Sequence, residues 1–542
     1  MSAYRWCSSF AAVVLIAWTG PSSSAPALAE PALPPWLPNV SVQELDLALP
    51  GDRFVRGHLD VNLTEPDQAW VARSKGLWIT GPLPAELSAL FPVLDGISGS
   101  ARIGWSGEIG ARSTHVVLSA GSRLQIDQWR LPDADWSLEA IDIVFGKGTV
   151  HAEYQHLTGW PDTLQGSLPV TLEAEFTYPG VVKTQIWTFE GELTLAGQGF
   201  QLEGQLRNAS GLGLDMVIGW SLDGAPALAL VLEGEAASVG EAIAGTLTAW
   251  PAPLTFSGGR VSLNLDVRLA ESGPEGSGSL VADNVSGLTN RTAWSGLDGD
   301  VELTLGDGQL SSHISAELAT INPGIPFGPV ALRAQYHADT GAPLAGELAL
   351  VKATSGFLGG LLRVKPQQWS LADLPVQATV WLNDLQLDQL MQAYPTEGLD
   401  GSGVLEGQMP ITVGADGVSV NGGQITAKAP GGTLSLPADR LQSLAANNDT
   451  MALVVDALQN FNYSVLSSTI DYDQSGQLNL GLRLEGKSPQ VLEGQPIVVN
   501  INLEEDIPAL MTSLQLSGRV NEAVAERVRQ LMERRQTSDT QD

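Results

Sequence analysis

The chain has 542 residues, and its 60 acidic side chains against 28 basic ones give a formal net charge of −32. This negative field repels phosphate backbones, so it argues against nucleic-acid binding, and it gives no support to membrane attachment through a polybasic patch. Charged residues make up only 16% of the chain, while glycine occurs 59 times and proline 32 times. With 43% apolar residues, the composition favours an ordered β-rich protein over a disordered one.

Residues 1–29 have the pattern of an export signal. Arg5 supplies a positive start, residues 10–18 form an apolar core that is too short to span a bilayer, and an A-x-A cleavage site ends at Ala29. The alternative is an uncleaved inner-membrane anchor, which Pro21 disfavours because it follows the apolar core so closely. We therefore expect an exported protein.

The single cysteine, Cys7, lies inside this signal segment. The mature chain then has no thiol, no disulfide and no cysteine-bound metal, whereas many eukaryotic secreted domains rely on disulfides. An exported, acidic chain without cysteine is more typical of the bacterial cell envelope.

Residues 30–370 form a repetitive region in which apolar and polar side chains alternate with period two. Clear examples are residues 170–178, 261–269 and 301–305. Each predicts a strand with one apolar and one wet face. Turn-forming clusters separate these segments, and Gly-x-Leu opens many of them at irregular spacing. We expect a mainly β fold, in which a long antiparallel sheet is accompanied by a few short helices in the C-terminal third.

The repeated apolar face has two interpretations. It is the core of ordinary sandwiches or barrels, or it lines one long curled sheet. About 25–30 strands in one layer would extend over about 120–145 Å, and open sheets of that size curl or split. A lengthwise curl encloses a trough suited to acyl chains, at about 0.8 kcal/mol per buried CH₂. The candidate groove residues are Val170, Leu172, Phe176, Val261, Leu263, Leu265, Val267, Leu269, Val301, Leu303 and Leu305.

The stretch "KAPGG", residues 428–432, illustrates the expected connections. Pro430 fixes φ and glycine accepts positive φ, so residues 429–432 can close a type II turn. We expect this turn to fold the chain back, so that the next strand takes its place along the lengthening sheet.

Helical signals are concentrated late in the chain. Residues 385–394 and 451–461 each place apolar side chains on one face. Residues 504–514 begin with acids and carry Pro508 in the first turn, which suits a helix N-terminus, and residues 520–535 form an amphipathic stripe.

No catalytic site, metal site or cofactor is predicted. The chain has no G-x-S-x-G, P-loop or H-E-x-x-H motif. The histidines nearest in sequence, His151 and His156, fall on opposite faces of a strand, so isolated surface histidines are expected. A hydrolase or glycan-active enzyme is therefore the least favoured function.

Residues 371–517 resemble the conserved domain of the YdbH family, which is related to AsmA-like proteins. The resemblance is carried by G-x-G-x-L-x-G-x-x-P at residues 401–410, by A-P-G-G at 429–432, and by N-x-N-L-E-E-[ND]-x-P-x-L-x-x-S-L at 500–514. It implies an elongated, curled sheet whose hydrophobic groove carries phospholipids between inner and outer membranes in the periplasm of a Gram-negative bacterium.

The resemblance also implies a partner, a small outer-membrane lipoprotein that adds a strand at the C-terminal end. The predicted strand 497–503 would have an edge with unpaired backbone groups. The helices that follow either cover this edge or flank a docking site for the partner's strand. The basic face of a helix in residues 518–542 could also meet anionic head groups. The docking candidates are Ile497, Val499, Ile501, Leu503, Leu510 and Leu514.

The sequence thus predicts a signal (1–29), a groove-forming β region (30–370), a YdbH-like domain (371–517), and an amphipathic helix with a polar tail (518–542). The preferred function is a non-enzymatic conduit that carries phospholipid across the periplasm, with a membrane at one or both ends. The alternative is a structural or assembly factor of the cell envelope with a closed, dry β core.

Overall fold

The fold is described from a computed structural model. The described residues are 39–49, 52–62, 71–83, 98–110, 113–130, 136–153, 163–197, 199–221, 224–248, 250, 254–270, 273–289, 292–322, 325–342, 345–373, 375–393, 399–414, 417–436, 449–474, 476–489, 491 and 495–506. Strands account for 78% of the structure and helices for 6%, which confirms the predicted β fold. Within the described residues, 29 strands belong to one antiparallel sheet, a number within the predicted range of about 25–30.

The chain divides into two compact units. Unit 1 comprises Met1–Ala252, Val261–Leu280 and Thr304–Gly308, and unit 2 comprises Pro253–Arg260, Val281–Leu303 and Gln309–Asp542. The predicted domain boundaries at residues 30, 371 and 518 stay predictions.

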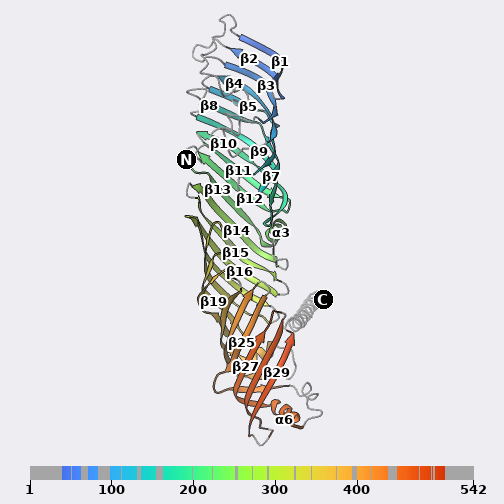
Figure 1. The fold of residues 1–542 in the computed structure, drawn as a ribbon, viewed down its shortest axis with the longest axis vertical. Helices are drawn as coiled ribbons and strands as arrows, with labels where there is room; N and C mark the ends of the chain where they lie inside the picture. Colours follow the sequence, from blue (N-terminus) through green and yellow to red (C-terminus); the bar gives the residue numbers. More distant parts are fainter. Residues whose placement is uncertain are drawn as a thin grey trace, which may run out of the picture. The chain divides into compact units, whose positions relative to one another are not determined.

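Unit 1 contains thirteen complete strands among the described residues. Most of them carry a label in Figure 1. They are β1 (Asn39–Leu49), β2 (Arg53–Asn62), β3 (Val71–Pro82), β4 (Gly99–Gly110), β5 (Ser113–Leu118), β6 (Ser122–Trp129), β7 (Ser137–Phe145), β8 (Gly148–Glu153), β9 (Thr163–Tyr178), β10 (Val182–Gly197), β11 (Gly199–Asn208), β12 (Gly213–Ser221) and β13 (Ala227–Glu235). Strands β14 (Leu254–Ala270), β15 (Gly273–Thr289) and β16 (Thr292–Gly306) contribute residues to both units.

Unit 2 contains the remaining strands. They are β17 (Gln309–Asn322), β18 (Val330–Asp339), β19 (Glu347–Phe357), β20 (Gly360–Val364), β21 (Gln367–Ser370), β22 (Val376–Gln386), β23 (Asp400–Ser402), β24 (Val404–Gly414), β25 (Gly417–Ala427), β26 (Gly432–Ser435), β27 (Phe461–Tyr472), β28 (Gln477–Lys487) and β29 (Pro496–Asp506).

Strand order in unit 1 departs from a simple meander between β4 and β9. Both β5 and β6 pair with β4, and both β7 and β8 pair with β9. The hairpin β6–β7 is therefore nested inside the pair β5–β8. From β9 to β13 each strand again pairs with its successor in the chain.

A similar arrangement in unit 2 corrects the prediction for "KAPGG". Strands β25 and β26 do not pair with each other, because both lie along β27. The hydrogen bond that closes the connection runs from Gly431 N to Lys428 O, at 2.9 Å, and the Ala429–Pro430 peptide is cis. The predicted type II turn at 429–432 is wrong. Strands β25 and β26 therefore run in the same direction along β27, and residues 428–432 connect them without reversing the chain.

The described part of the chain contains three helices, α3 (Ala236–Thr246), α4 (Leu387–Ala393) and α6 (Asp449–Leu458). The last two confirm the helices predicted at 385–394 and 451–461. Helix α3 was not predicted, because its small residues give no strong apolar stripe although alanine favours a helix. No described helix combines the length and apolar character needed to cross a membrane.

The helix predicted to start at residue 504 is wrong at its beginning. Strand β29 continues to Asp506, and Glu504 lies opposite Asn479 of β28. The rest of that predicted helix, and the predicted helix at 520–535, lie outside the described residues.

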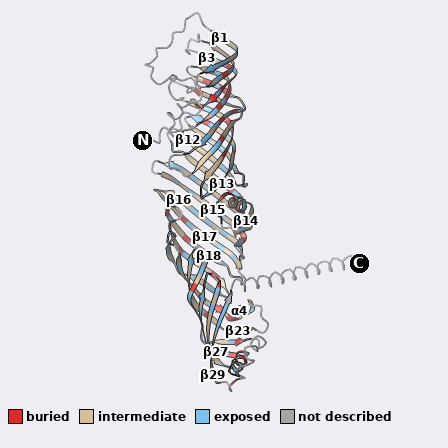
Figure 2. Ribbon diagram, turned by 45° about the vertical axis from the view of Figure 1, so that its right-hand side comes forward, coloured by how far each residue is buried: buried red, intermediate tan, exposed pale blue. Residues whose placement is uncertain are grey.

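Buried side chains gather in two main clusters, one in each unit. The unit 1 cluster includes Leu77, Trp105 and Val116, and the unit 2 cluster includes Phe461 and Leu484. In Figure 2 the buried residues, drawn in red, are frequent in β3 and β4 and sparse in β11–β16, where intermediate and exposed residues alternate.

Candidate functional site

Strands β11–β13 of unit 1 present an apolar face that is only half-buried. Every second residue of β11 is intermediate in exposure, while the residues between them are exposed and mostly polar. The register places Leu202 opposite Ile218, and Ile218 opposite Leu228. None of these three side chains is buried. Neighbouring strands thus line up their apolar side chains without a protein layer that covers them fully.

Strand β14 extends this face. Leu269 N donates to Pro226 O at 2.8 Å, next to the start of β13. In an antiparallel pair, two-residue steps from this contact place Val267 beside Leu228 and Leu265 beside Leu230. All four are intermediate in exposure. We call the following set of unit 1 residues the open face: Phe200, Leu202, Leu206, Leu214, Met216, Ile218, Trp220, Leu228, Leu230, Leu263, Leu265 and Val267.

The predicted groove residues on β14 fall into two groups. Val261, Leu263, Leu265 and Val267 are intermediate in exposure and alternate with polar residues. Leu269 is 59% exposed, because it lies at the end of the strand beside Pro226. The first four side chains therefore have the partial cover that a binding surface needs, and Leu269 has less.

The candidates on β9 lie in a more enclosed environment. Val170 is 7% exposed and belongs to the unit 1 cluster. Leu172 and Phe176 are intermediate in exposure. The ring of Phe176 contacts Trp136 and Trp187, with centroid distances of 6.2 and 6.4 Å. Val170 already has the packing of a protein core, so it offers less surface to a ligand than Leu265.

The candidates on β16 resemble those on β14. Val301 and Leu303 in unit 2, and Leu305 in unit 1, are all intermediate in exposure. They alternate with the exposed Glu302 and Thr304. For all eleven candidates, contact with lipid stays a prediction.

Sequence reasoning missed several features of the open face. Phe200 and Trp220 are register partners whose ring centroids lie 5.9 Å apart. Near this face, Trp187 lies opposite Asn208, and its indole N–H is buried without a hydrogen-bond partner among the described residues. The aromatic residues were visible in the sequence, but only the register reveals that they meet.

Helix α3 is anchored beside the open face through Asn208. The amide Nδ2 of this buried residue donates to Thr246 Oγ1 at 2.7 Å, and Thr246 Oγ1 donates to Ala242 O at 2.7 Å. Asn208 Oδ1 accepts from the backbone N–H groups of Ser210 and Leu212, at 3.1 and 2.9 Å. One side chain therefore ties the β11–β12 turn to the end of the helix.

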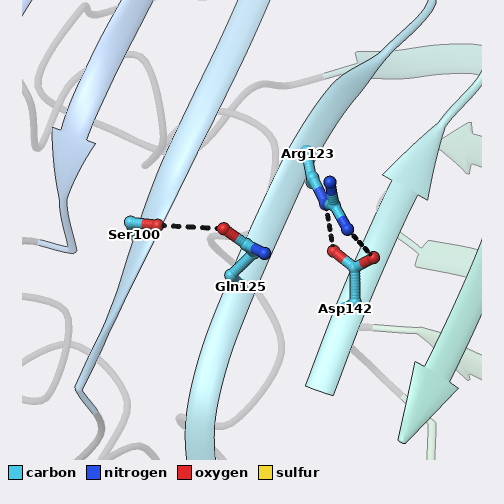
Figure 3. Close-up of polar contacts among 4 residues, drawn as sticks. All are labelled: Ser100, Arg123, Gln125 and Asp142. Carbon is cyan, nitrogen blue, oxygen red and sulfur yellow. Dashed lines mark hydrogen bonds and ion pairs between the residues drawn. The ribbon is translucent and has the colours of Figure 1, made fainter. Parts of the chain in front are cut away.

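The opposite face of unit 1 is polar and is joined by cross-strand contacts. Arg123 on β6 makes two hydrogen bonds to the carboxylate of Asp142 on β7, and Ser100 Oγ on β4 donates to Gln125 Oε1 at 3.4 Å (Figure 3). The Asp142 carboxylate raises the pKa of the Arg123 guanidinium above its usual value, chiefly through these hydrogen bonds. Such pairs fix the register and keep this face wet.

A cavity of about 520 Å³ lies among residues of β11–β15 in unit 1. The register puts Gln201, Gly219 and Ala227 in one cross-strand row, and these residues line the cavity. The hollow exists because glycine and alanine do not fill the space between longer side chains such as Arg268. Leu228 and Val267 of the open face also line the cavity, so it adjoins that face.

The predicted docking residues on β29 belong mostly to the closed core of unit 2. Val499 is 4% exposed, and Ile497 and Ile501 pack against the same cluster. Leu503 is 42% exposed, and Leu510 and Leu514 lie outside the described residues. The first three side chains point into their own unit, so a docked strand would have to bind mainly through the β29 backbone.

Comparison with protein families gives one match that covers most of the chain. Residues 59–529 match the YdbH-like model, described as "Intermembrane phospholipid transport protein YdbH". The match extends well beyond residues 371–517, where the resemblance was read from the sequence. Comparison with curated proteins found no match. The chain belongs to the YdbH-like family of intermembrane phospholipid transport proteins.

Proposed function

We propose that this chain is a non-enzymatic conduit that carries phospholipid across the periplasm between the inner and outer membranes. The observation that carries the proposal is the open face, on which twelve apolar side chains are aligned by register and remain half-buried. Family membership supports the same role, because the matching model is one of phospholipid transport.

The open face has the chemistry that an acyl chain requires. Each CH₂ that leaves water against this face contributes about 0.8 kcal/mol. A charged head group would lose several kcal/mol if it were buried without a partner, so it stays in solvent at the rim. The face presents no ionisable side chain among its twelve residues, so an acyl chain can move along it without passing a charge.

The closed clusters favour a second candidate function. Leu484 and Phe461 are fully buried, as expected for a structural or assembly factor with a dry core. On that alternative, the open face would be covered by a partner protein instead of lipid. The two candidates differ in whether the purified chain carries phospholipid.

The test is lipid co-purification with a matched pair of variants. The mature chain is purified in mild detergent, and its extracted phospholipid is quantified by mass spectrometry. Leu265→Asp puts a charge on the open face and should lower bound phospholipid several-fold. Asn264→Asp adds the same charge at a neighbouring exposed residue and should leave it unchanged. A lipid-free wild-type chain would support the alternative.

The proposal also includes a partner, a small outer-membrane lipoprotein that adds a strand beside β29. Among the described residues, the registered neighbour of β29 is β28. Val498 is 53% exposed on β29, so Val498→Lys would place a charge on the edge strand, which opposes strand addition. Val465 is 39% exposed on β27, a strand with neighbours on both sides, and Val465→Lys is the matched control. Only the first substitution should reduce lipoprotein recovery from an envelope fraction.

A further inference from the structure

Two histidines far apart in the sequence lie side by side on the polar face of unit 1. Strands β5 and β8 pair in an antiparallel register that places His115 directly opposite His151. The ring centroids are 5.6 Å apart, and the ring planes make an angle of 62°. His115 is exposed, and the His151 side chain is 39% exposed. Both imidazoles are therefore accessible to a small ligand from solvent.

The distance between the rings suits a shared metal ion. A zinc–nitrogen bond of about 2.0–2.1 Å puts the metal about 3.2 Å from each ring centroid. Tetrahedral geometry then places two such centroids about 5.2 Å apart. The observed 5.6 Å differs by an amount that small side-chain rotations can supply, because neither ring is locked in a core.

The surroundings of His151 indicate which nitrogen is available. Its Nδ1 is buried and has no hydrogen-bond partner among the described residues. Its Nε2 lies 3.5 Å from Glu153 Oε1, which is too long for a good hydrogen bond. Thr163 Oγ1 donates to the other carboxylate oxygen, Oε2, at 3.4 Å. A cation at Nε2 would thus lie next to a positioned negative charge.

A second carboxylate lies on the other side of the pair. Glu108 is opposite His115 in the β4–β5 register, and its Oε1 accepts from Arg73 Nε at 2.6 Å. This carboxylate is already neutralised in part by arginine. The described residues contain no group of three or more histidine, cysteine or acidic side chains arranged to hold a metal ion, so water would complete the coordination.

We propose that His115 and His151 form a two-imidazole site for a divalent transition-metal cation of the zinc or copper class. Imidazole suits these cations, whereas magnesium and calcium prefer oxygen ligands. The bound ion would join β5 to β8 and stabilise unit 1, because it binds the folded chain in preference to the unfolded one. The sequence spacing between His151 and His156 could not reveal this pair, because only the pairing of β5 with β8 brings His115 next to His151.

The test is a Zn²⁺ titration of the full chain, purified without a histidine tag, by isothermal calorimetry. We expect one saturable site, which His115→Ala and His151→Ala each weaken by about tenfold or more. His313→Ala removes an exposed histidine on β17 and should leave the affinity unchanged. Absence of saturation below about 1 mM Zn²⁺ would overturn the proposal, and so would unchanged affinity in either His115 or His151 variant.

A spectroscopic measurement guards against variants that fold poorly. With one equivalent of Cu²⁺, electron paramagnetic resonance of the wild-type chain should show coupling to two imidazole nitrogens. His151→Gln should reduce this to one, with an unchanged far-ultraviolet circular dichroism spectrum. A wild-type spectrum with a single coupled nitrogen would exclude the two-histidine site.

Discussion

The closed core of unit 2 and the open face of unit 1 are built from the same alternating strand pattern, yet their apolar residues differ in exposure. On β27 and β28, Phe461 and Leu484 are fully buried, whereas Leu202 and Leu265 in unit 1 are half-buried. The difference follows from what covers each face. Helices α4 and α6 contribute Leu387, Val455, Ala457 and Leu458 to the unit 2 core. Helix α3 contacts β10 and β13, and it does not bury the side chains of the open face.

The period-two pattern therefore specifies which face of a strand is apolar, but it does not specify whether another protein layer covers that face. A second layer of protein converts the face into a core. Where the layer is missing, the same pattern leaves apolar surface that can receive a ligand.

The largest effect is expected at Phe461. This side chain is fully buried against Tyr463 and the helix α6 residues of the unit 2 cluster. Phe461→Ala should lower the free energy of unfolding by about 3–5 kcal/mol, because it removes an aromatic ring and leaves a cavity. Urea unfolding followed by circular dichroism measures the change. A loss below about 1 kcal/mol would show that this core is not closed.

A matched pair of leucines makes the comparison directly. Leu484→Ala in the closed core should cost about 2–5 kcal/mol. Leu265→Ala on the open face should cost about 1 kcal/mol or less, because this side chain is only partly covered by protein. Both are measured by the same urea titration. Equal losses would mean that the open face is a core after all.

The anchor of helix α3 should give an intermediate effect. Asn208→Ala removes the hydrogen bond to Thr246 and leaves the N–H groups of Ser210 and Leu212 without their side-chain acceptor. We expect a loss of about 1–3 kcal/mol. Ser311→Ala, at a hydroxyl that meets His337 on an exposed surface, is a control that should change stability little. Similar values for the two variants would exclude the anchoring role.

The smallest effect concerns acid stability at the first hairpin of unit 1. Hydrogen bonds from Ser41 and then His58 lower the pKa of Asp60 below its ordinary value of 3.8. A carboxyl whose pKa is lowered by folding stabilises the folded chain at pH values above its ordinary pKa. This stabilisation is lost as the pH falls through the lowered pKa of the folded state. At pH 6 the wild-type chain should therefore unfold at a higher urea concentration than Asp60→Asn. This difference between the two urea midpoints should shrink below about pH 4. A pH-independent difference would contradict this.

Much of the architecture was predictable because strand alternation is a local signal. The strand with Val261 and Leu265 was assigned correctly, and so were helices α4 and α6. Helix α3 was missed because it packs through small residues such as Gly240 and Ala242, which form no apolar stripe. The β29 extension was missed because acids at 504–506 suit a helix start as well as an exposed strand end.

The family motifs were recognised, but their structural role depends on contacts between distant strands. Gly403 has φ +134°, and a Cβ there would overlap the hydroxyl of Tyr463. That hydroxyl donates to Ser402 O at 2.7 Å, and burial raises the pKa of Tyr463. A Cβ on Gly432 would overlap the Ser402 carbonyl oxygen. These glycines permit close packing of β23, β26 and β27, which no local pattern could reveal.

The open face was only partly predictable for the same reason. The sequence identified the apolar side of β14, but the partners on β11–β13 emerge only from the register. Likewise, Lys428 looked like a turn residue, whereas its Nζ bridges Asp384 at 2.7 Å and Glu406 at 3.2 Å on other strands.

Photo-crosslinking at two adjacent positions of β14 tests the central claim most directly. A diazirine amino acid replaces Leu265 on the open face or Asn264 on the polar face, and the chain is irradiated in cells before lipid adducts are measured by mass spectrometry. We expect phospholipid adducts from position 265 and few from position 264. Adducts from 264 with only protein captured at 265, or no lipid adduct from either position, would contradict that claim.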